Sequence, residues 1–202
     1  PAPPYLSIRD MTPEMTPEQL RSFERQVADL FEAGAIPGPV HLSGGNEDQL
    51  IRIFSKINPR DWVFSTWRNH YHALLKGIPE ELVLDQIRQG RSMNLMFPEY
   101  RFFTSAIVGG IAPIATGVAM AHKNIGPEVW CFIGDMAAET GVVRESMAFA
   151  DHHLLPINFI VEDNKFSCNS PTAKTTLKHE YRSGYSYERT WPHTGTGNWV
   201  TF

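Results

Sequence analysis

The stretch Val-Trp-Cys-Phe-Ile-Gly-Asp, residues 129–135, decides the fold class. Its first five residues form a continuous apolar run, too short for a helix and rich in strand formers, which predicts a strand buried on both faces. A second such run, Pro-Ile-Asn-Phe-Ile-Val, occupies residues 156–161 and is followed by Glu-Asp-Asn, and a helical pattern over residues 140–153 lies between the two runs. Strand, helix and strand with short connections predict a right-handed parallel βαβ unit. We therefore expect an α/β fold with a mostly parallel sheet and helices on both faces.

Three helices are expected upstream of this unit. The first begins with a capping box at Thr16 and runs to Gly34. The second covers about residues 46–57 and the third about residues 79–90. A fourth candidate helix is the uncharged stretch over residues 105–121. Its length is at the short end of the roughly 17–25 residues that a membrane span needs, and it contains three glycines and a proline. A close-packed buried helix is therefore favoured over a membrane span.

The composition indicates one domain over residues 1–202. The chain is long enough to form a single core, and its 42% of hydrophobic residues are enough to fill that core. We expect residues 1–15 to form an N-terminal tail, whereas residues 170–202 have no role that the sequence assigns. The formal net charge of −4 offers no excess of positive charge to follow a phosphate backbone, so nucleic acid is not expected as a partner.

The cysteine content favours a reducing compartment. Cys131 and Cys168 are too few for a disulfide framework, and they do not form a Cys-x-x-Cys pair. The first residues show no basic patch followed by an apolar run, so they do not resemble a secretory signal. We therefore expect a cytoplasmic protein that has no membrane partner.

Polar residues follow both predicted strands at their carboxyl ends. Asp135 and Asn164 are 29 positions apart, but the ends of neighbouring parallel strands meet at one edge of a sheet, where ligands bind. A carboxylate and an amide oxygen together suit a hard cation such as Mg²⁺. The backbone amides of Met136, Ala137 and Ala138 could then cradle a diphosphate. Taken singly, each side chain is also an ordinary turn or N-cap residue, so spacing alone leaves both interpretations open.

These residues resemble a known cofactor motif. The segment over residues 134–164 is similar to the thiamine diphosphate motif, which begins Gly-Asp-Gly and ends Asn-Asn. It begins with Gly134-Asp135, contains Gly141 and Glu145, and ends with Asp163-Asn164. The closest version is that of the alpha subunits of 2-oxo acid dehydrogenases, in their decarboxylating first component. The resemblance extends over about residues 41–167, and its upstream blocks are His41-Leu42 with Gly45 and Glu47, Trp67-Arg68-Asn69-His70, Ser92-Met93-Asn94, and Ile107-Val108-Gly109 with Pro113 and Gly117.

The resemblance implies a thiamine diphosphate-binding fold, with thiamine diphosphate and Mg²⁺ as cofactors. The Mg²⁺ ligands would be Asp135, Asn164 and the backbone carbonyl of Phe166. Arg68 would bind the diphosphate, and Trp67 replaces the tyrosine that is usual in the family. The cofactor-binding residues would be Trp67, Arg68, Val108, Gly109, Gly134, Asp135, Met136, Ala137 and Asn164, with the backbone at Val108 and Gly109 approaching the aminopyrimidine.

The resemblance also implies that His41 and His70 face the reacting end of the cofactor. Each of these assignments has a plain structural alternative. Arg68 could be a surface arginine on a polar helix, and His41 and His70 belong to a set of eight histidines, most of which must be structural or solvated.

The chain departs from the family pattern at three places. Met136 replaces the third residue of the motif, a glycine, and Asn94 stands where alpha subunits usually have a histidine. Only 38 residues follow Asn164, so we expect the chain to lack the longer C-terminal region of the family, with its further active-site histidine. The carboxylic acid that assists the thiamine chemistry comes from a second domain in this family. The resemblance therefore implies a short variant that needs a beta-type partner carrying the pyrimidine-binding domain, in an α2β2 assembly.

Three functions remain in competition. The first is the alpha-type subunit of a thiamine diphosphate-dependent enzyme that acts on a 2-oxo acid, by decarboxylation with acyl or aldehyde transfer. The second is a subunit of a split transketolase-like or acyloin-forming carboligase that acts on sugars or aldehydes. The third is a non-catalytic scaffold subunit, which the substitutions at Met136 and Asn94 suggest.

Overall fold

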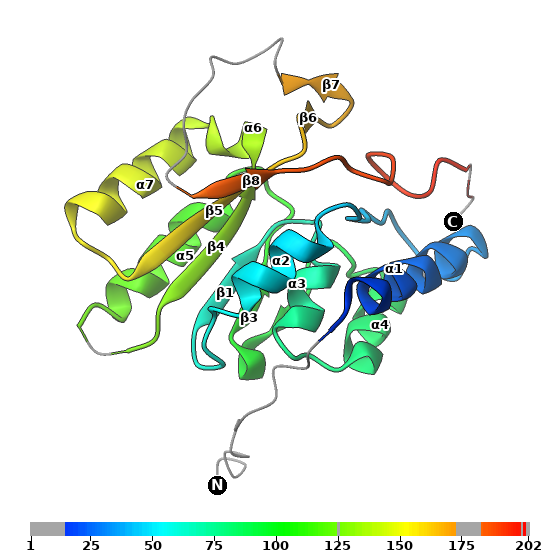
Figure 1. The fold of residues 1–202 in the computed structure, drawn as a ribbon, viewed down its shortest axis with the longest axis horizontal. Helices are drawn as coiled ribbons and strands as arrows, with labels where there is room; N and C mark the ends of the chain where they lie inside the picture. The colour runs from blue at the N-terminus through cyan, green and yellow to red at the C-terminus, as the bar shows by residue number, and fades with distance from the viewer. Residues whose placement is uncertain (1–14, 125, 173–182, 199, 201–202) are drawn as a thin grey trace, which may run out of the picture.

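A six-stranded sheet with helices on both faces organises the chain (Figure 1). The structure is a computed structural model and describes residues 15–124, 126–172, 183–198 and 200. Of the N-terminal tail expected over residues 1–15, all but the last residue lies outside these ranges. The expectation of one domain over the whole chain stays a prediction.

The strand order of the large sheet is β2-β3-β1-β4-β5-β8. Only β2 runs antiparallel to its neighbour, so the mostly parallel α/β fold is confirmed. Two further strands, β6 and β7, form a small antiparallel pair. The strands are β1 (Trp62–Ser65), β2 (Met96–Phe97), β3 (Phe102–Thr104), β4 (Val129–Gly134), β5 (Ile157–Asp163), β6 (Phe166–Ser167), β7 (Ser170–Pro171) and β8 (Gly184–Ser186).

The helices agree with most of the sequence expectations. They are α1 (Pro17–Glu32), α2 (Glu47–Phe54), α3 (His70–Leu75), α4 (Glu80–Arg88), α5 (Ile111–Ala121), α6 (Asp135–Ala138) and α7 (Gly141–His152), with a short 3-10 turn at Pro98–Tyr100. The capping box of α1 is present, because the Thr16 hydroxyl accepts from the Gln19 amide and the Gln19 side chain accepts from the Thr16 amide. None of the described helices is long and apolar enough to cross a bilayer.

The helix expected over residues 105–121 differs from its prediction in two ways. It begins only at Ile111, because residues 105–110 form a loop in which Gly109 has φ +73°, a left-handed conformation that interrupts a helix. It is also not buried all round. Ile114 and Met120 lie exposed on its outer face, whereas the opposite face packs on the sheet and on α7.

Both faces of β4 are buried, as its apolar run predicts. Trp130 and Phe132 pack into the cluster formed with α1–α4, and Cys131 and Ile133 pack into the cluster formed with α5 and α7. Burying a side chain of this size contributes about 1.5–3 kcal/mol, so the run of alternating contacts holds the two helical layers on the sheet. β4 and β5 pair in parallel, and the connection between them contains α7, which confirms the predicted βαβ unit.

The direction in which the chain adds strands to the sheet changes between β1 and β4. From β1 the chain adds β3 on one side, and it then returns through α5 to add β4 on the other side. Such a switch point leaves a crevice at the carboxyl ends of the two strands, because their outgoing loops turn in opposite directions. The loop that follows Ser65 and the helix α6 that follows Gly134 therefore start at this crevice.

Residues 183–198 gain a structural role that the sequence does not indicate. β8 pairs in parallel with β5, and the chain then crosses toward α1 beside the loop at residues 40–45 (Figure 1). The Gly195 amide donates to the Val40 carbonyl at 2.8 Å. The contact is close at Gly45, where an added Cβ would lie 2.0 Å from the Glu188 carbonyl oxygen. We call residues 187–195 the C-terminal strap.

Candidate active site

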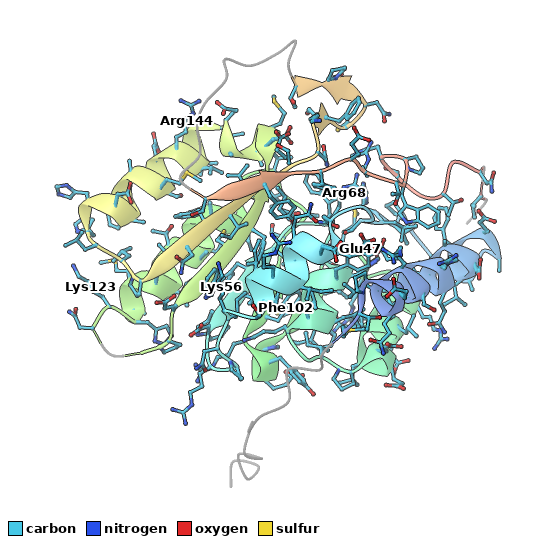
Figure 2. All side chains as sticks on the ribbon, in the orientation of Figure 1. Glu47, Lys56, Arg68, Phe102, Lys123 and Arg144 are labelled. Carbon is cyan, nitrogen blue, oxygen red and sulfur yellow. The ribbon has the colours of Figure 1, made fainter. Side chains whose placement is uncertain are left out.

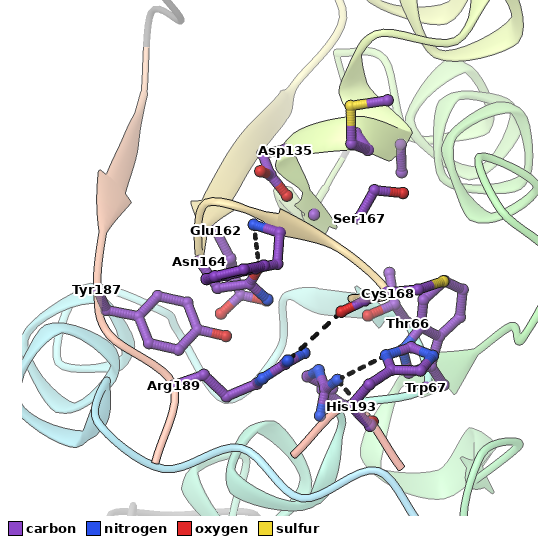
Figure 3. Close-up of a pocket in the computed structure, with 15 residues that line it drawn as sticks. Thr66, Trp67, Asp135, Glu162, Asn164, Ser167, Cys168, Tyr187, Arg189 and His193 are labelled. Atoms are coloured by element: carbon purple, nitrogen blue, oxygen red, sulfur yellow. Dashed lines mark hydrogen bonds between the residues drawn. The ribbon is translucent and has the colours of Figure 1, made fainter. Parts of the chain in front are cut away.

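A pocket opens at the switch point of the sheet, at the carboxyl ends of β1, β4 and β5 (Figure 3). Its volume is about 580 Å³, counting the part that is open to solvent. It is lined by Thr66, Trp67, Arg68, Gly134, Asp135, Met136, Ala137, Glu162, Asn164, Phe166, Ser167, Cys168, Tyr187, Arg189 and His193.

Asp135 provides a buried carboxylate in this pocket. It is the first residue of α6, directly after β4, and only 7% of its surface is exposed. Burial, together with the negative charge of neighbouring Asp163, raises the pKa of its carboxyl to about 6. Asp163 is held in place by the Lys165 amide at 2.8 Å and the Ser186 hydroxyl at 3.0 Å. Two adjacent carboxylates favour a bound cation, because its charge offsets their repulsion.

Asn164 and Phe166 lie in the same pocket as Asp135. The Asn164 side-chain oxygen accepts from the Phe166 amide at 3.0 Å, which closes a turn at the end of β5. The structure thus brings together all three residues that the resemblance assigns to a metal. Within the described ranges no group of three His, Cys, Asp or Glu side chains is arranged to hold a metal ion, so a site here would combine one or two carboxylates with amide and carbonyl oxygens.

Arg68 is buried in the pocket wall, and the surface-arginine alternative is wrong. Only 7% of its surface is exposed, and Figure 2 shows it inside the molecule, whereas Arg144 projects from the surface. Its Nη1 donates to the Leu42 carbonyl at 2.6 Å, and its Nη2 donates to the His193 carbonyl at 2.8 Å. The same Nη2 lies 3.2 Å from Nδ1 of His193. Burial lowers the pKa of the guanidinium to about 10, so it stays charged at neutral pH.

His41 lies behind the pocket wall. Its ring packs against Trp67 and His193, with centroids 5.9 and 5.0 Å away, and its Nε2 is 3.2 Å from the Thr194 hydroxyl. Burial, with a further contribution from the charge of Arg68, lowers the pKa of His41 to about 3. His41 is therefore neutral at physiological pH and supports two pocket residues.

His70 does not line the pocket, and the expectation that it faces the reacting end of a cofactor stays a prediction. The side chain is fully buried at the start of α3. Its Nε2 is 2.9 Å from the Ser92 hydroxyl, and its Nδ1 is 3.5 Å from a carboxylate oxygen of Glu24 on α1. α3 begins at His70 and packs against α1, so the ring lies between these two helices.

Val108 and Gly109 also lie outside the pocket lining. Val108 is 54% exposed on the loop before α5. Gly109 approaches α7 closely, since an added Cβ would lie 2.8 Å from both the Thr140 hydroxyl and a methyl group of Val142. In this chain the glycine is therefore needed for loop packing, and its predicted contact with a cofactor stays a prediction.

Seven lining residues were not among the predicted site residues. Glu162 had a signal, because it opens the polar Glu-Asp-Asn end of β5, and it accepts hydrogen bonds from Tyr185 and Asn46. The sequence carries no such signal for the strap residues. Their position depends on the three-residue strand β8, which pairs with the distant strand β5. The seven are Thr66, Glu162, Ser167, Cys168, Tyr187, Arg189 and His193.

The fold and the site define a parallel α/β protein with a charged ligand pocket at the switch point of its sheet. The chain belongs to the dehydrogenase E1 component family, which it matches over residues 15–188. It is 31% identical to the pyruvate dehydrogenase E1 component subunit alpha of Rickettsia bellii, over 83% of this chain and 56% of that protein. It is 32% identical to the Zymomonas mobilis subunit of the same name, over 73% of this chain and 46% of that protein.

The chain spans about half the length of the curated relatives it matches. Among solved structures, transketolase from Leishmania mexicana is similar in fold, with a TM-score of 0.54 and 17% sequence identity. That match covers 81% of this chain and 30% of the transketolase, and at such low identity it supports the fold alone.

Proposed function

We propose that this chain is the alpha-type subunit of a thiamine diphosphate- and Mg²⁺-dependent enzyme that acts on a 2-oxo acid. The observation that carries the proposal is the meeting of Asp135, Asn164 and Phe166 in one pocket at the switch point of the sheet. The names of the relatives, which are pyruvate dehydrogenase alpha subunits, support the choice of a 2-oxo acid as substrate.

The residues present fit the cofactor. The carboxylate of Asp135, the amide oxygen of Asn164 and the carbonyl of Phe166 would hold Mg²⁺, which prefers oxygen ligands. Met136 and Ala137 line the pocket, and their backbone amides would contact the diphosphate. A Cβ added at Gly134 would meet no atom within 4 Å, so there is open space beside the end of β4. When bound, thiamine diphosphate supplies a nucleophilic carbon and an electron sink for cleavage beside a carbonyl.

A beta-type partner is part of the proposal, in an α2β2 assembly. Support comes from apolar side chains exposed on and beside α5, among them Ile107 at 73%, Val108, Ile114 and Met120 at 59%. Apolar residues gathered on one side of a protein commonly mark an interaction surface. We also propose a cytoplasmic location, which the two free cysteines, Cys131 and Cys168, support.

Calorimetric titration tests the cofactor assignment. The chain, co-expressed with a beta-type E1 subunit from the same genome, is titrated with thiamine diphosphate in the presence and absence of Mg²⁺. We expect binding that requires Mg²⁺ and that Asp135→Asn weakens by at least about a hundredfold, because a charged ligand becomes neutral. Asp85→Asn on α4 is the matched control, since Asp85 is exposed and away from the pocket lining. Equal affinity in Asp135→Asn, or no binding by the parent complex, would refute the proposal.

Substrate oxidation tests the choice of substrate. Reduction of ferricyanide by the loaded complex in the presence of 2-oxo acids is the expected result. Product formation from ketoses without any reaction of 2-oxo acids would favour the transketolase-like alternative. If the cofactor binds but the complex turns over neither class of substrate, the non-catalytic scaffold alternative is favoured.

A further inference from the structure

Three consecutive residues of the loop after β1 line the pocket. They are Thr66, Trp67 and Arg68. The loop is short, since β1 ends at Ser65 and α3 begins at His70. A shift of its main chain would therefore move all three lining side chains together, and the contacts that hold this main chain help to set the shape of the site.

His72, on α3, contacts this loop from inside the molecule. Its ring is fully buried, and its Nδ1 lies 3.1 Å from the carbonyl oxygen of Arg68 and 3.1 Å from the hydroxyl of Ser65. A carbonyl oxygen can only accept, so Nδ1 carries a hydrogen and donates to the Arg68 carbonyl. One ring nitrogen thus contacts both the last residue of β1 and the main chain of Arg68.

The other nitrogen of the same ring faces the pocket residue Glu162. Nε2 of His72 lies 3.3 Å from Oε1 of Glu162. That oxygen also accepts hydrogen bonds from Tyr185 on β8 and from Asn46, the N-cap residue of α2. A chain of polar contacts therefore runs from α2 and β8 through Glu162 and His72 to the main chain of Arg68.

Two phenylalanine rings pack against His72. The centroid of its ring is 4.4 Å from that of Phe132 on β4 and 5.9 Å from that of Phe54 on α2. Both phenylalanines are buried. A hydrogen bond shielded from water in this way is stronger than an exposed one, because the local dielectric constant is low. The contact between His72 and the Arg68 carbonyl is therefore both shielded and fixed in direction.

Arg68 is consequently held at both ends. Its guanidinium donates to the carbonyls of Leu42 and His193, and its own carbonyl accepts from His72. A binding loop that is already ordered lowers the cost of binding, because it does not have to be fixed when the ligand arrives.

We propose that His72 is a positioning residue of the pocket. Its donor to the Arg68 carbonyl sets the main chain of residues 66–68, and so the places of the three side chains that line the pocket. The ring is fully buried, so it acts through the loop and does not touch the ligand. The inference rests on the proposed function, because the ligand concerned is thiamine diphosphate.

Two amide substitutions separate the two polar contacts of His72. The side-chain nitrogen of asparagine lies about as far from the main chain as Nδ1 of histidine, and that of glutamine about as far as Nε2. His72→Asn can therefore keep the donor to the Arg68 carbonyl, whereas His72→Gln can keep only the contact with Glu162. Both variants lose the ring that packs against Phe132, so a purely structural role predicts the same affinity for both.

Calorimetry on the complex with the beta-type subunit measures the effect. The parent and each variant are titrated with thiamine diphosphate in the presence of Mg²⁺, and their melting temperatures are recorded. We expect His72→Asn to bind within about twofold of the parent and His72→Gln about five- to tenfold more weakly, as for one lost hydrogen bond. The melting temperatures of the two variants should fall by similar amounts. The matched control is His152→Gln, an exposed site at the end of α7, which should change neither quantity.

The outcomes separate this inference from the proposed function. If the parent complex does not bind thiamine diphosphate, both are refuted. If it binds and His72→Gln binds at least as tightly as His72→Asn, only the role of His72 is refuted. If either amide variant does not fold, His72→Leu is compared with the parent, because leucine suits the apolar surroundings of the ring and lacks the donor. Weaker binding by folded His72→Leu supports the inference, and parental affinity overturns it.

Discussion

Nη2 of Arg68 lies 2.8 Å from the carbonyl oxygen of His193, although 125 residues separate the two in the chain. The same guanidinium donates to the Leu42 carbonyl at 2.6 Å. One side chain therefore connects the loop after β1, the loop before α2 and the C-terminal strap. Because the loop after β1 and the strap both line the pocket, its shape depends on this connection.

Replacing Arg68 should destabilise the fold. In Arg68→Met the buried Leu42 carbonyl and the part-buried His193 carbonyl lose a charged donor, and we expect a loss of about 2–3 kcal/mol in the free energy of unfolding. Urea denaturation measures the loss, and limited proteolysis should cut the strap faster. Arg88→Met should change stability by less than about 0.5 kcal/mol, as exposed sites do. Unchanged stability of Arg68→Met would show that the connection is dispensable.

His70→Ala should affect stability and leave cofactor affinity unchanged. The substitution removes a fully buried ring with contacts to Ser92 and Glu24, which should cost about 2–4 kcal/mol. Urea denaturation and calorimetry with thiamine diphosphate and Mg²⁺ give the two quantities. A variant with normal stability and cofactor binding but no turnover would return His70 to the catalytic residues.

His41 should make the protein less stable in acid. Its pKa is about 3 in the folded state, where it is buried beside Arg68, against an ordinary value of 6.5. Between these values the unfolded chain binds one more proton, so the stability that is present above pH 6.5 is lost as the pH falls toward 3. The slope from this residue is at most about 1.4 kcal/mol per pH unit. Urea denaturation from pH 7 to pH 4.5 should show a flatter profile for His41→Gln. Parallel profiles would contradict the prediction.

Two glycine substitutions should have opposite effects. Gly45→Ala places a methyl group 2.0 Å from the Glu188 carbonyl, at a φ of +91° that alanine rarely adopts, so it should displace the strap and lower stability by several kcal/mol. In Gly117→Ala the methyl group meets open space on α5, so it should raise the stability of the isolated chain by up to about 1 kcal/mol. Thermal unfolding of both variants separates the two effects, which are backbone and steric strain at residue 45 and helix propensity at residue 117. A stable Gly45→Ala would show that the strap can move.

A charge on the outer face of α5 should block assembly. Ile114→Glu should abolish co-purification with the beta-type subunit, because the buried interface would then contain an unpaired carboxylate. Leu82→Glu on α4 is the control, since Leu82 is similarly exposed but lies in the other helical layer. Light scattering measures the mass of each complex. Normal assembly of Ile114→Glu would place the interface elsewhere.

The strands at the centre of the sheet are predictable because each is a long apolar run with turn residues after it. β4 and β5 are of this kind, and the position of Asp135 and Asn164 at their carboxyl ends follows from the sequence alone. β1, β3 and β8 have only three or four residues each, and segments this short cannot be told from loops by their sequence pattern. Their places depend on hydrogen bonds to strands far away in the chain.

The histidines show the same limit within the site. His41, His70 and His193 are alike as residue types, and the family resemblance selected the first two. The structure places His193 in the pocket, His41 behind its wall and His70 between helices. No local pattern distinguishes these environments, because each depends on segments more than a hundred residues apart or on the packing of α1 against α3.

The sequence by itself determined the α/β class, the central βαβ unit and the acidic end of the pocket. All of these follow from local periodicity and from residues next to a strand. Only the tertiary structure decided which residues complete the pocket, including Arg189 and His193, and that Arg68 is tied to the strap. The reason is physical: local pattern reports which face of an element is buried, whereas the partner of a buried donor is set by the folding of the whole chain.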